Sequence, residues 1–196
     1  MVRPPPDFSS LKITHERGPV TRQVRTAALA WGGDAAWADI LAAVSPACRA
    51  RFARPIGFYE WVESELALEL HAAWAAHQGV DDMSQRGEDG ARELLGGVQQ
   101  WILRLASPAF LIENVPKLYG FYYRGGRMNL AYLGPGKAGL EFNAMGYPES
   151  WFRDGLTAWL RVALALTGAR EVRVHHVPPN TPETPHLHRY EIAWRA

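Results

Sequence analysis

The chain has very little cysteine and no long apolar run. Cys48 is the one cysteine among 196 residues, which excludes an internal disulfide and fits a reducing compartment. No stretch approaches the roughly 20 consecutive apolar residues that a membrane-spanning helix needs. The N-terminus, MVRPPPDFSS, lacks the apolar core of a signal peptide. We therefore expect a cytoplasmic protein without a membrane span.

An excess of charge of either sign is also missing. Lys and Arg number 21 against 20 Asp and Glu, for a net charge of +1, so the chain as a whole carries no electrostatic footprint for a nucleic acid. Catalytic signatures are missing too. No Gly-x-Ser-x-Gly occurs, Cys48 has no histidine near it in sequence, and GPGKAG at 134–139 lacks the P-loop spacing and is typical of a turn between strands. We expect a protein that is not an enzyme.

Aromatic residues are plentiful. The chain is 47% hydrophobic and contains eight Trp, which is typical of a globular protein. Tryptophan rings fill cores, but they also line pockets and interfaces, so their number favours a binding protein.

The hydrophobic spacing changes along the chain from helical to alternating. Residues 1–18 read as a disordered or extended leader, and 19–196 as a single domain with a helical part (19–118) and a sheet part (119–196). Within the helical part, helices are expected from Pro19 to Gly32-Gly33, from Asp34 onwards, from Ser45-Pro46 to Phe52, over 58–77 and over 94–105. A short helix or turn is expected to end at Val115-Pro116. The strands expected in the second part lie at 119–123, 127–133, 138–144, 171–177 and 186–194, and a helix at 148–167.

Together these elements predict an α+β fold. N-terminal helices pack on an antiparallel sheet of four or five strands, with one long crossing helix and a terminal hairpin.

Two stretches also carry a family resemblance. WADILAAVSPACRARFARPIGFYEWVE (37–63) and the tail LTGAREVRVHHVPPN…RYEIAWRA resemble a paralogous myxobacterial family of unknown function. That family is similar to the superfold shared by heme nitric-oxide-binding domains, 4-vinyl reductase domains and TRAPP-type subunits of vesicle-tethering complexes. The resemblance implies helices on a twisted antiparallel sheet, with a ligand pocket between them or a dimeric scaffold.

The cofactor signals of those families are missing. Heme nitric-oxide sensors use a proximal histidine on a helix and a Tyr-x-Ser-x-Arg motif, and this chain has no such motif. His71 and His77 lie six residues apart and so on different faces of their helix. A single cysteine cannot supply the Cys/His cluster of some 4-vinyl reductase domains. Heme is therefore doubtful as a cofactor.

The histidines of the terminal hairpin are the best chemical candidates. His186 and His188 point to the same face of a strand, and one of His175 and His176 can join them across the hairpin. Three imidazoles on one face suit Zn or Cu. An exposed polar edge or a pH-responsive cluster is the alternative interpretation. We take His175, His186 and His188 as the predicted metal ligands.

Aromatic side chains flank the predicted seam between helices and sheet. An unfilled part of that seam would form an apolar pocket for a small hydrophobic or planar molecule, whereas a filled seam would be ordinary core. The predicted ligand-binding residues are Trp61, Trp74, Trp101, Tyr122 and Trp159.

The sequence therefore favours a cytosolic sensory or regulatory module that binds a small hydrophobic ligand or a protein partner. A dimeric interaction scaffold without a pocket is the first alternative. Metal-dependent activity at the hairpin histidines is the second.

Overall fold

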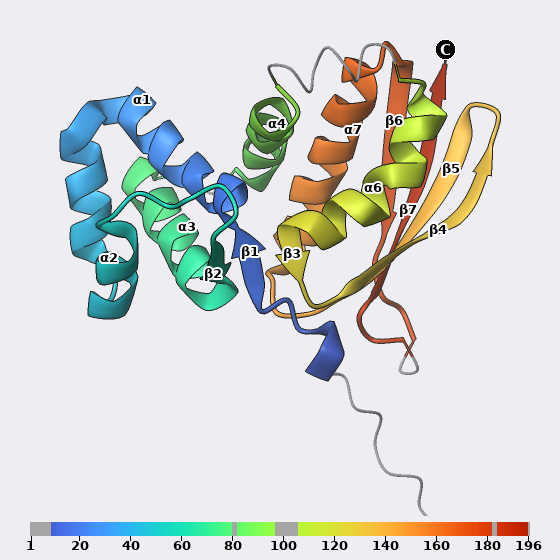
Figure 1. The fold of residues 1–196 in the computed structure, drawn as a ribbon. Coiled ribbons are helices and arrows are strands. Elements are labelled where there is room, and N and C mark those ends of the chain that lie inside the picture. The colour runs from blue at the N-terminus through green and yellow to red at the C-terminus, as the bar shows by residue number, and fades with distance from the viewer. Residues whose placement is uncertain (1–8, 80–81, 97–105, 182–183, 196) are drawn as a thin grey trace, which may run out of the picture.

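The computed structural model describes residues 9–79, 82–96, 106–181 and 184–195. Its two halves stand side by side in Figure 1, with helices α1 to α3 on one side and a sheet covered by α6 and α7 on the other. The elements of the first half are η1 (Ser9–Leu11), β1 (His15–Arg17), α1 (Gly18–Ala43), α2 (Pro46–Phe52), β2 (Trp61–Glu63), α3 (Ser64–Gln78) and α4 (Met83–Leu94). Those of the second half are α6 (Pro108–Tyr122), β3 (Tyr123–Arg124), β4 (Arg127–Gly134), β5 (Lys137–Asn143), the π-helix η2 (Trp151–Leu156), α7 (Thr157–Leu166), β6 (Arg170–Val177) and β7 (Leu187–Arg195).

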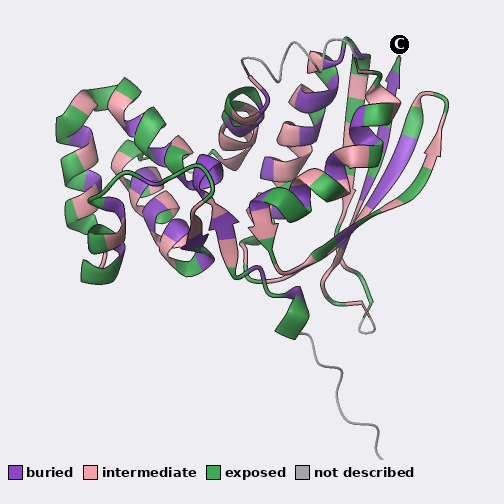
Figure 2. Ribbon diagram, viewed as in Figure 1, coloured by how far each residue is buried: buried purple, intermediate pink, exposed green. Residues whose placement is uncertain are grey.

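The sheet of the second half confirms the predicted α+β class. Its strand order is β4-β5-β7-β6, and every neighbouring pair is antiparallel. Along β7 the side chains of His188, Tyr190, Ile192 and Trp194 are buried, while those between them are half-buried or exposed. Such alternation marks a sheet with one covered face, and α6 and α7 pack against β4 and β6 to cover it. Figure 2 shows the buried residues gathered where these helices meet the sheet.

Sequence cues explain several helix boundaries. Ser45 and Ser107 cap α2 and α6 by accepting hydrogen bonds from the backbone amides of Cys48 and Phe110. The helix break expected at Gly32-Gly33 is present inside α1, because both glycines have non-helical backbone angles and Gly33 has a φ of 67° that favours glycine. The second helical stretch, expected from Asp34, then runs to Ala43.

The strand predicted at 119–123 is wrong, because α6 continues through these residues to Tyr122. The stretch GFYYR contains three aromatic residues in a row, and aromatic residues are frequent in strands. However, Val115, Tyr119 and Tyr122 are spaced as one buried helix face. Pro116 lies inside α6, so it is not the boundary that it indicated in the sequence.

Two further predicted boundaries differ from the structure. The helix expected from residue 58 begins only at Ser64, because 61–63 pair with β1 as strand β2. The helix expected over 148–167 is divided into η2 and α7. The helix expected over 94–105 falls mostly on 97–105, which lie outside the described residues.

The residues between the two halves form a second, small sheet of order β2-β1-β3. Residues 9–17, which belong to the leader expected from the sequence, form η1 and the central strand β1 of this sheet. Ile13 is 1% exposed and packs in the core of the second half. Among the described helices, none is both long and apolar enough to cross a membrane.

Candidate functional site: a seam cavity and a histidine cluster

A cavity of about 120 Å³ lies at the join of the two halves, and we call it the seam cavity. Its walls are mostly apolar. One wall comes from α1 and α3, and the other from α6, β3, β4, η2, α7 and the Tyr147 segment. Helix α4, which packs against α7 and η2, also lines the cavity. The lining residues include Val20, Gln23, Leu68, His71, Arg86, Leu118, Tyr119, Tyr122, Tyr123, Tyr147, Trp151, Leu156 and Trp159.

The structure brings two of the five predicted ligand-binding aromatics to this cavity, Tyr122 and Trp159. Trp61 lies in β2 instead, where its ring contacts the guanidinium groups of Arg17 at 4.5 Å and Arg124 at 4.3 Å. Trp74 is 4% exposed and belongs to the core of the helical half. Trp101 lies outside the described residues.

His71, which was considered from the sequence only as a heme ligand, lines the cavity. Burial, with a smaller contribution from the Arg86 cation, lowers the pKa of His71 to about 4, so its imidazole is neutral at pH 7. Leu68 and His71 are three residues apart on α3 and share its cavity-facing side. The sequence alone predicts that these two residues share one side of a helix. It does not predict which side of α3 faces the second half.

A buried carboxyl group lies next to the seam cavity. Glu16 of β1 is 1% exposed and accepts hydrogen bonds from Thr21 Oγ1 at 2.9 Å and from the cavity-lining Tyr147 hydroxyl at 2.8 Å. The Tyr147 hydroxyl also lies 3.3 Å from Ser64 Oγ. Burial raises the pKa of Glu16 to about 7, although both hydrogen bonds lower it. The group therefore titrates near neutral pH.

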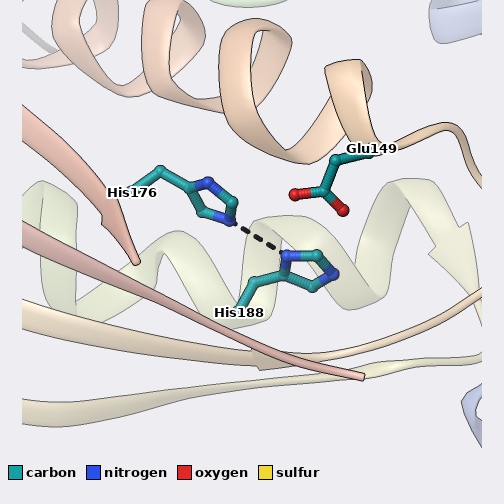
Figure 3. Close-up of side chains that lie close together, drawn as sticks. All are labelled: Glu149, His176 and His188. Carbon is teal, nitrogen blue, oxygen red and sulfur yellow. Dashed lines mark hydrogen bonds between the residues drawn. The ribbon is translucent and has the colours of Figure 1, made fainter. Parts of the chain in front are cut away.

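Two hairpin histidines meet on the covered side of the sheet. His176 Nε2 and His188 Nδ1 lie 3.0 Å apart, and Figure 3 shows the Glu149 carboxylate turned towards the same space. Ligand atoms of Glu149, His176 and His188 all lie within 4.8 Å of one another. The Phe152 ring stacks on His188 with centroids 3.9 Å apart, which fixes the orientation of that imidazole.

Of the predicted metal ligands, His188 alone belongs to this group. His175 points to the other face of β6, where its side chain is 74% exposed and Nδ1 lies 3.8 Å from a Glu191 carboxylate oxygen. His186 precedes β7 and lies outside the group, although its charge, like that of His176, helps burial to lower the pKa of His188 to about 4. The structure thus selects His176 from the adjacent pair and adds Glu149.

Comparison with solved structures identifies the fold. A triple mutant of the H-NOX protein from S. oneidensis in the Fe(II) ligation state superposes with a TM-score of 0.67 at 12% identity, over 92% of this chain and 96% of that one. The Fe(II) unliganded H-NOX protein from K. algicida gives a TM-score of 0.64 at 8% identity, over 92% and 97%. An oxygen-binding H-NOX domain related to soluble guanylate cyclases gives 0.59 at 10%, over 91% and 93%.

At these identities the comparison establishes the fold alone, which is the heme nitric-oxide-binding fold of the predicted superfold. No family model and no curated protein matches the chain in sequence.

The described residues do not fit a heme. The seam cavity is close in size to a cavity of about 150 Å³ that holds benzene, whereas a porphyrin contains four pyrrole rings. The chain approaches the Tyr-x-Ser-x-Arg motif in Tyr123-x-Gly125-x-Arg127, with glycine in place of serine. Gly125 has a φ of 86°, and a Cβ there would overlap the carbonyl oxygen of Lys12. This backbone therefore has no room for the serine.

The two helix histidines lie in different places. His77 packs against Trp31 and Trp74 in the helical half. His71 lines the cavity.

Proposed function

We propose that this protein is a non-enzymatic sensory or regulatory module that binds a small, largely apolar molecule in the seam cavity, without heme. We also propose that it acts in the cytoplasm and belongs with the myxobacterial family that its sequence resembles. The observation that carries the proposal is the seam cavity itself, which has apolar walls contributed by both halves of the chain.

The size and lining of the cavity define the ligand class. Space of about 120 Å³ with mostly apolar walls suits a molecule of about the size of benzene. His71 adds a neutral imidazole, which can donate or accept one hydrogen bond. A monocyclic ligand with one polar substituent matches both features.

The position of the cavity supports a sensory role. Its walls come from helices of the first half and from α6, η2 and α7 of the second, so a ligand contacts both halves at once. A ligand shifts a conformational equilibrium only as far as it binds one state better than the other. A molecule held between the halves binds best when they are closed together, and so favours the closed arrangement.

The test is calorimetric titration of the protein with phenol and benzene, alongside an absorbance titration with hemin. We expect saturable binding of one aromatic molecule per chain and no heme spectrum characteristic of an axially ligated complex. Leu68→Phe fills the cavity from α3 and should abolish aromatic binding. Leu66→Phe is the matched control, because Leu66 lies on the same helix but packs against the helical core. Equal binding by both variants, or stoichiometric axial ligation of hemin, would contradict the proposal.

A patch of exposed aromatic rings favours a second candidate function, the dimeric scaffold. Phe58, Tyr59 and Phe121 are 39%, 72% and 38% exposed, and the Phe58 ring lies within 6.5 Å of both of the others. Sedimentation equilibrium of the wild type and of a Phe58→Ser/Tyr59→Ser variant tests it. A dimer that the double variant splits would support this function, and a monomeric wild type would reject it.

A further inference from the structure

The group formed by Glu149, His176 and His188 combines three elements of the second half. Glu149 stands just before η2, His176 lies near the end of β6 and His188 near the start of β7. Figure 3 shows all three side chains directed into one space between the π-helix and the hairpin. Two of them are already oriented, because the imidazoles share a hydrogen bond and His188 stacks on Phe152.

We propose that these three side chains form a binding site for one divalent transition-metal ion, with Zn²⁺ as the best match. Two imidazole nitrogens and one carboxylate oxygen are a donor set that Zn²⁺ accepts, and three protein ligands leave a fourth position for water. The site is distinct from the seam cavity, since none of the three residues lines that cavity.

The geometry needs a rotation of the two imidazole rings. In tetrahedral zinc sites with Zn–N bonds of 2.0–2.1 Å, two ligating nitrogens stand roughly 3.3 Å apart. His176 Nε2 and His188 Nδ1 are 3.0 Å apart, and the ion displaces the proton that they share once both rings turn so that their lone pairs converge beside the line between the nitrogens. That proton moves through solvent to the other nitrogen of the donating imidazole, which stays neutral. The Glu149 carboxylate is exposed and free to rotate onto the ion.

The surrounding charges are compatible with a cation. Arg153 is a positive group near the site, and its guanidinium lies 2.8 Å from the Asp154 carboxylate. With Zn²⁺ bound, the site would have a net charge of +1, because the ion contributes +2, Glu149 −1 and the imidazoles none.

A bound ion would fix one wall of the seam cavity. The π-helix η2 is attached to β7 by the Phe152–His188 stack and by a hydrogen bond of 2.9 Å from the Tyr190 hydroxyl to the Phe152 carbonyl. Its residues Trp151 and Gly155 line the cavity. Coordination by Glu149 would add a third attachment at the start of the same helix.

The experiment is calorimetric titration of the full chain, purified without a polyhistidine tag, with Zn²⁺, and an absorbance titration with Co²⁺. We expect one ion per chain and visible Co²⁺ bands typical of low coordination number. Glu149→Gln and His176→Gln should each weaken Zn²⁺ binding at least about tenfold, since even changes outside the ligand set cost that much. Glu149 is exposed, so its variant tests the site without the risk of unfolding.

His175→Gln is the matched control, because it removes the neighbouring imidazole on the opposite face of the same strand. Its Zn²⁺ affinity should equal that of the wild type. The proposal is overturned if the wild type binds no stoichiometric ion, if His175→Gln weakens binding as much as His176→Gln, or if Glu149→Gln leaves the affinity unchanged.

Discussion

The two halves of the molecule differ from the seam between them in how completely they are packed. In the sheet half, Phe142 is fully buried and its ring contacts Tyr119, Trp151 and Phe152 with centroids 4.6–6.0 Å apart. In the helical half, Ile40, Leu70 and Trp74 form a separate buried cluster. The seam carries the cavity and the buried Glu16 instead. Space and buried charge thus lie where two independently packed cores meet, which is where a ligand can affect both.

Truncating a side chain in the core should lower the free energy of unfolding more than truncating one beside the seam cavity. Phe142→Ala should lower the free energy of unfolding by about 3–5 kcal/mol, because it leaves a void in a closed core. Leu68→Ala, which borders existing empty space, should cost only about 2 kcal/mol, near the lower end of such substitutions. Urea denaturation of both variants gives the two values. Equal costs would mean that the seam is as tightly packed as the core.

The buried Glu16 carboxyl group at the seam should make the stability of the protein depend on pH. The pKa of Glu16 is about 7 in the folded chain and 4.5 in the reference state, so between these values the folded protein binds more protons than the unfolded one. Its contribution to stability therefore falls as pH rises from about 4.5 to 7, by roughly 3 kcal/mol, and is constant above that.

Urea denaturation of the wild type and of Glu16→Gln across this pH range measures the effect. His71 and His188 titrate in both proteins, with lowered pKa values that act in the opposite direction, so the difference between the two curves isolates Glu16. Parallel curves would show that Glu16 does not titrate in this range.

A substitution at Gly125 tests whether the backbone there has room for the serine of the heme-binding motif. Gly125→Ser restores Tyr-x-Ser-x-Arg, but it places a side chain at a φ of 86° and against the Lys12 carbonyl oxygen. We expect a loss of more than about 1 kcal/mol of stability, without any gain in heme binding. Denaturation and a hemin titration of the variant measure the two. A stable variant that binds heme would show that the fold retains the sensor site and lacks only the serine.

The smallest expected effect is the difference in binding free energy between a polar and an apolar aromatic ligand. Phenol should bind more tightly than benzene by roughly 0.5–1.5 kcal/mol, the net value of one hydrogen bond to His71. In His71→Leu that preference should disappear while benzene still binds, as titrations of both ligands would show. A preference retained in the variant would assign the hydrogen bond to another lining group, such as Arg86 or a tyrosine.

The sequence predicted the strands of the sheet more accurately than the residues that line the seam cavity. Alternation along RYEIAWR and the Gly-Pro-Gly turn at 134–136 are local signals, and they placed β5 and β7 correctly. The strand predicted at 119–123 failed because a short aromatic-rich stretch fits either a strand or a buried helix face, and packing against β4 decides between them.

Which residues reach the site depends on which side of each helix or strand faces the seam, and local sequence patterns do not specify that. Tyr122 and Trp159 reach the cavity while Trp61 and Trp74 face elsewhere, because each helix or strand turns one side towards the seam. His176 rather than His175 meets His188 for the same kind of reason, since the choice depends on which face of β6 the helices cover. Glu149 is far from both histidines in sequence, and no spacing rule connects it to them.

The proposed function depends most on the seam cavity being a binding space of benzene size. A crystal structure of the protein under xenon pressure tests this directly, because xenon enters dry apolar cavities of this volume. We predict a xenon atom between α3 and α6, in contact with Leu68 and Leu118, in a protein that carries no heme. Absence of xenon from this position, or a porphyrin in its place, would contradict the account.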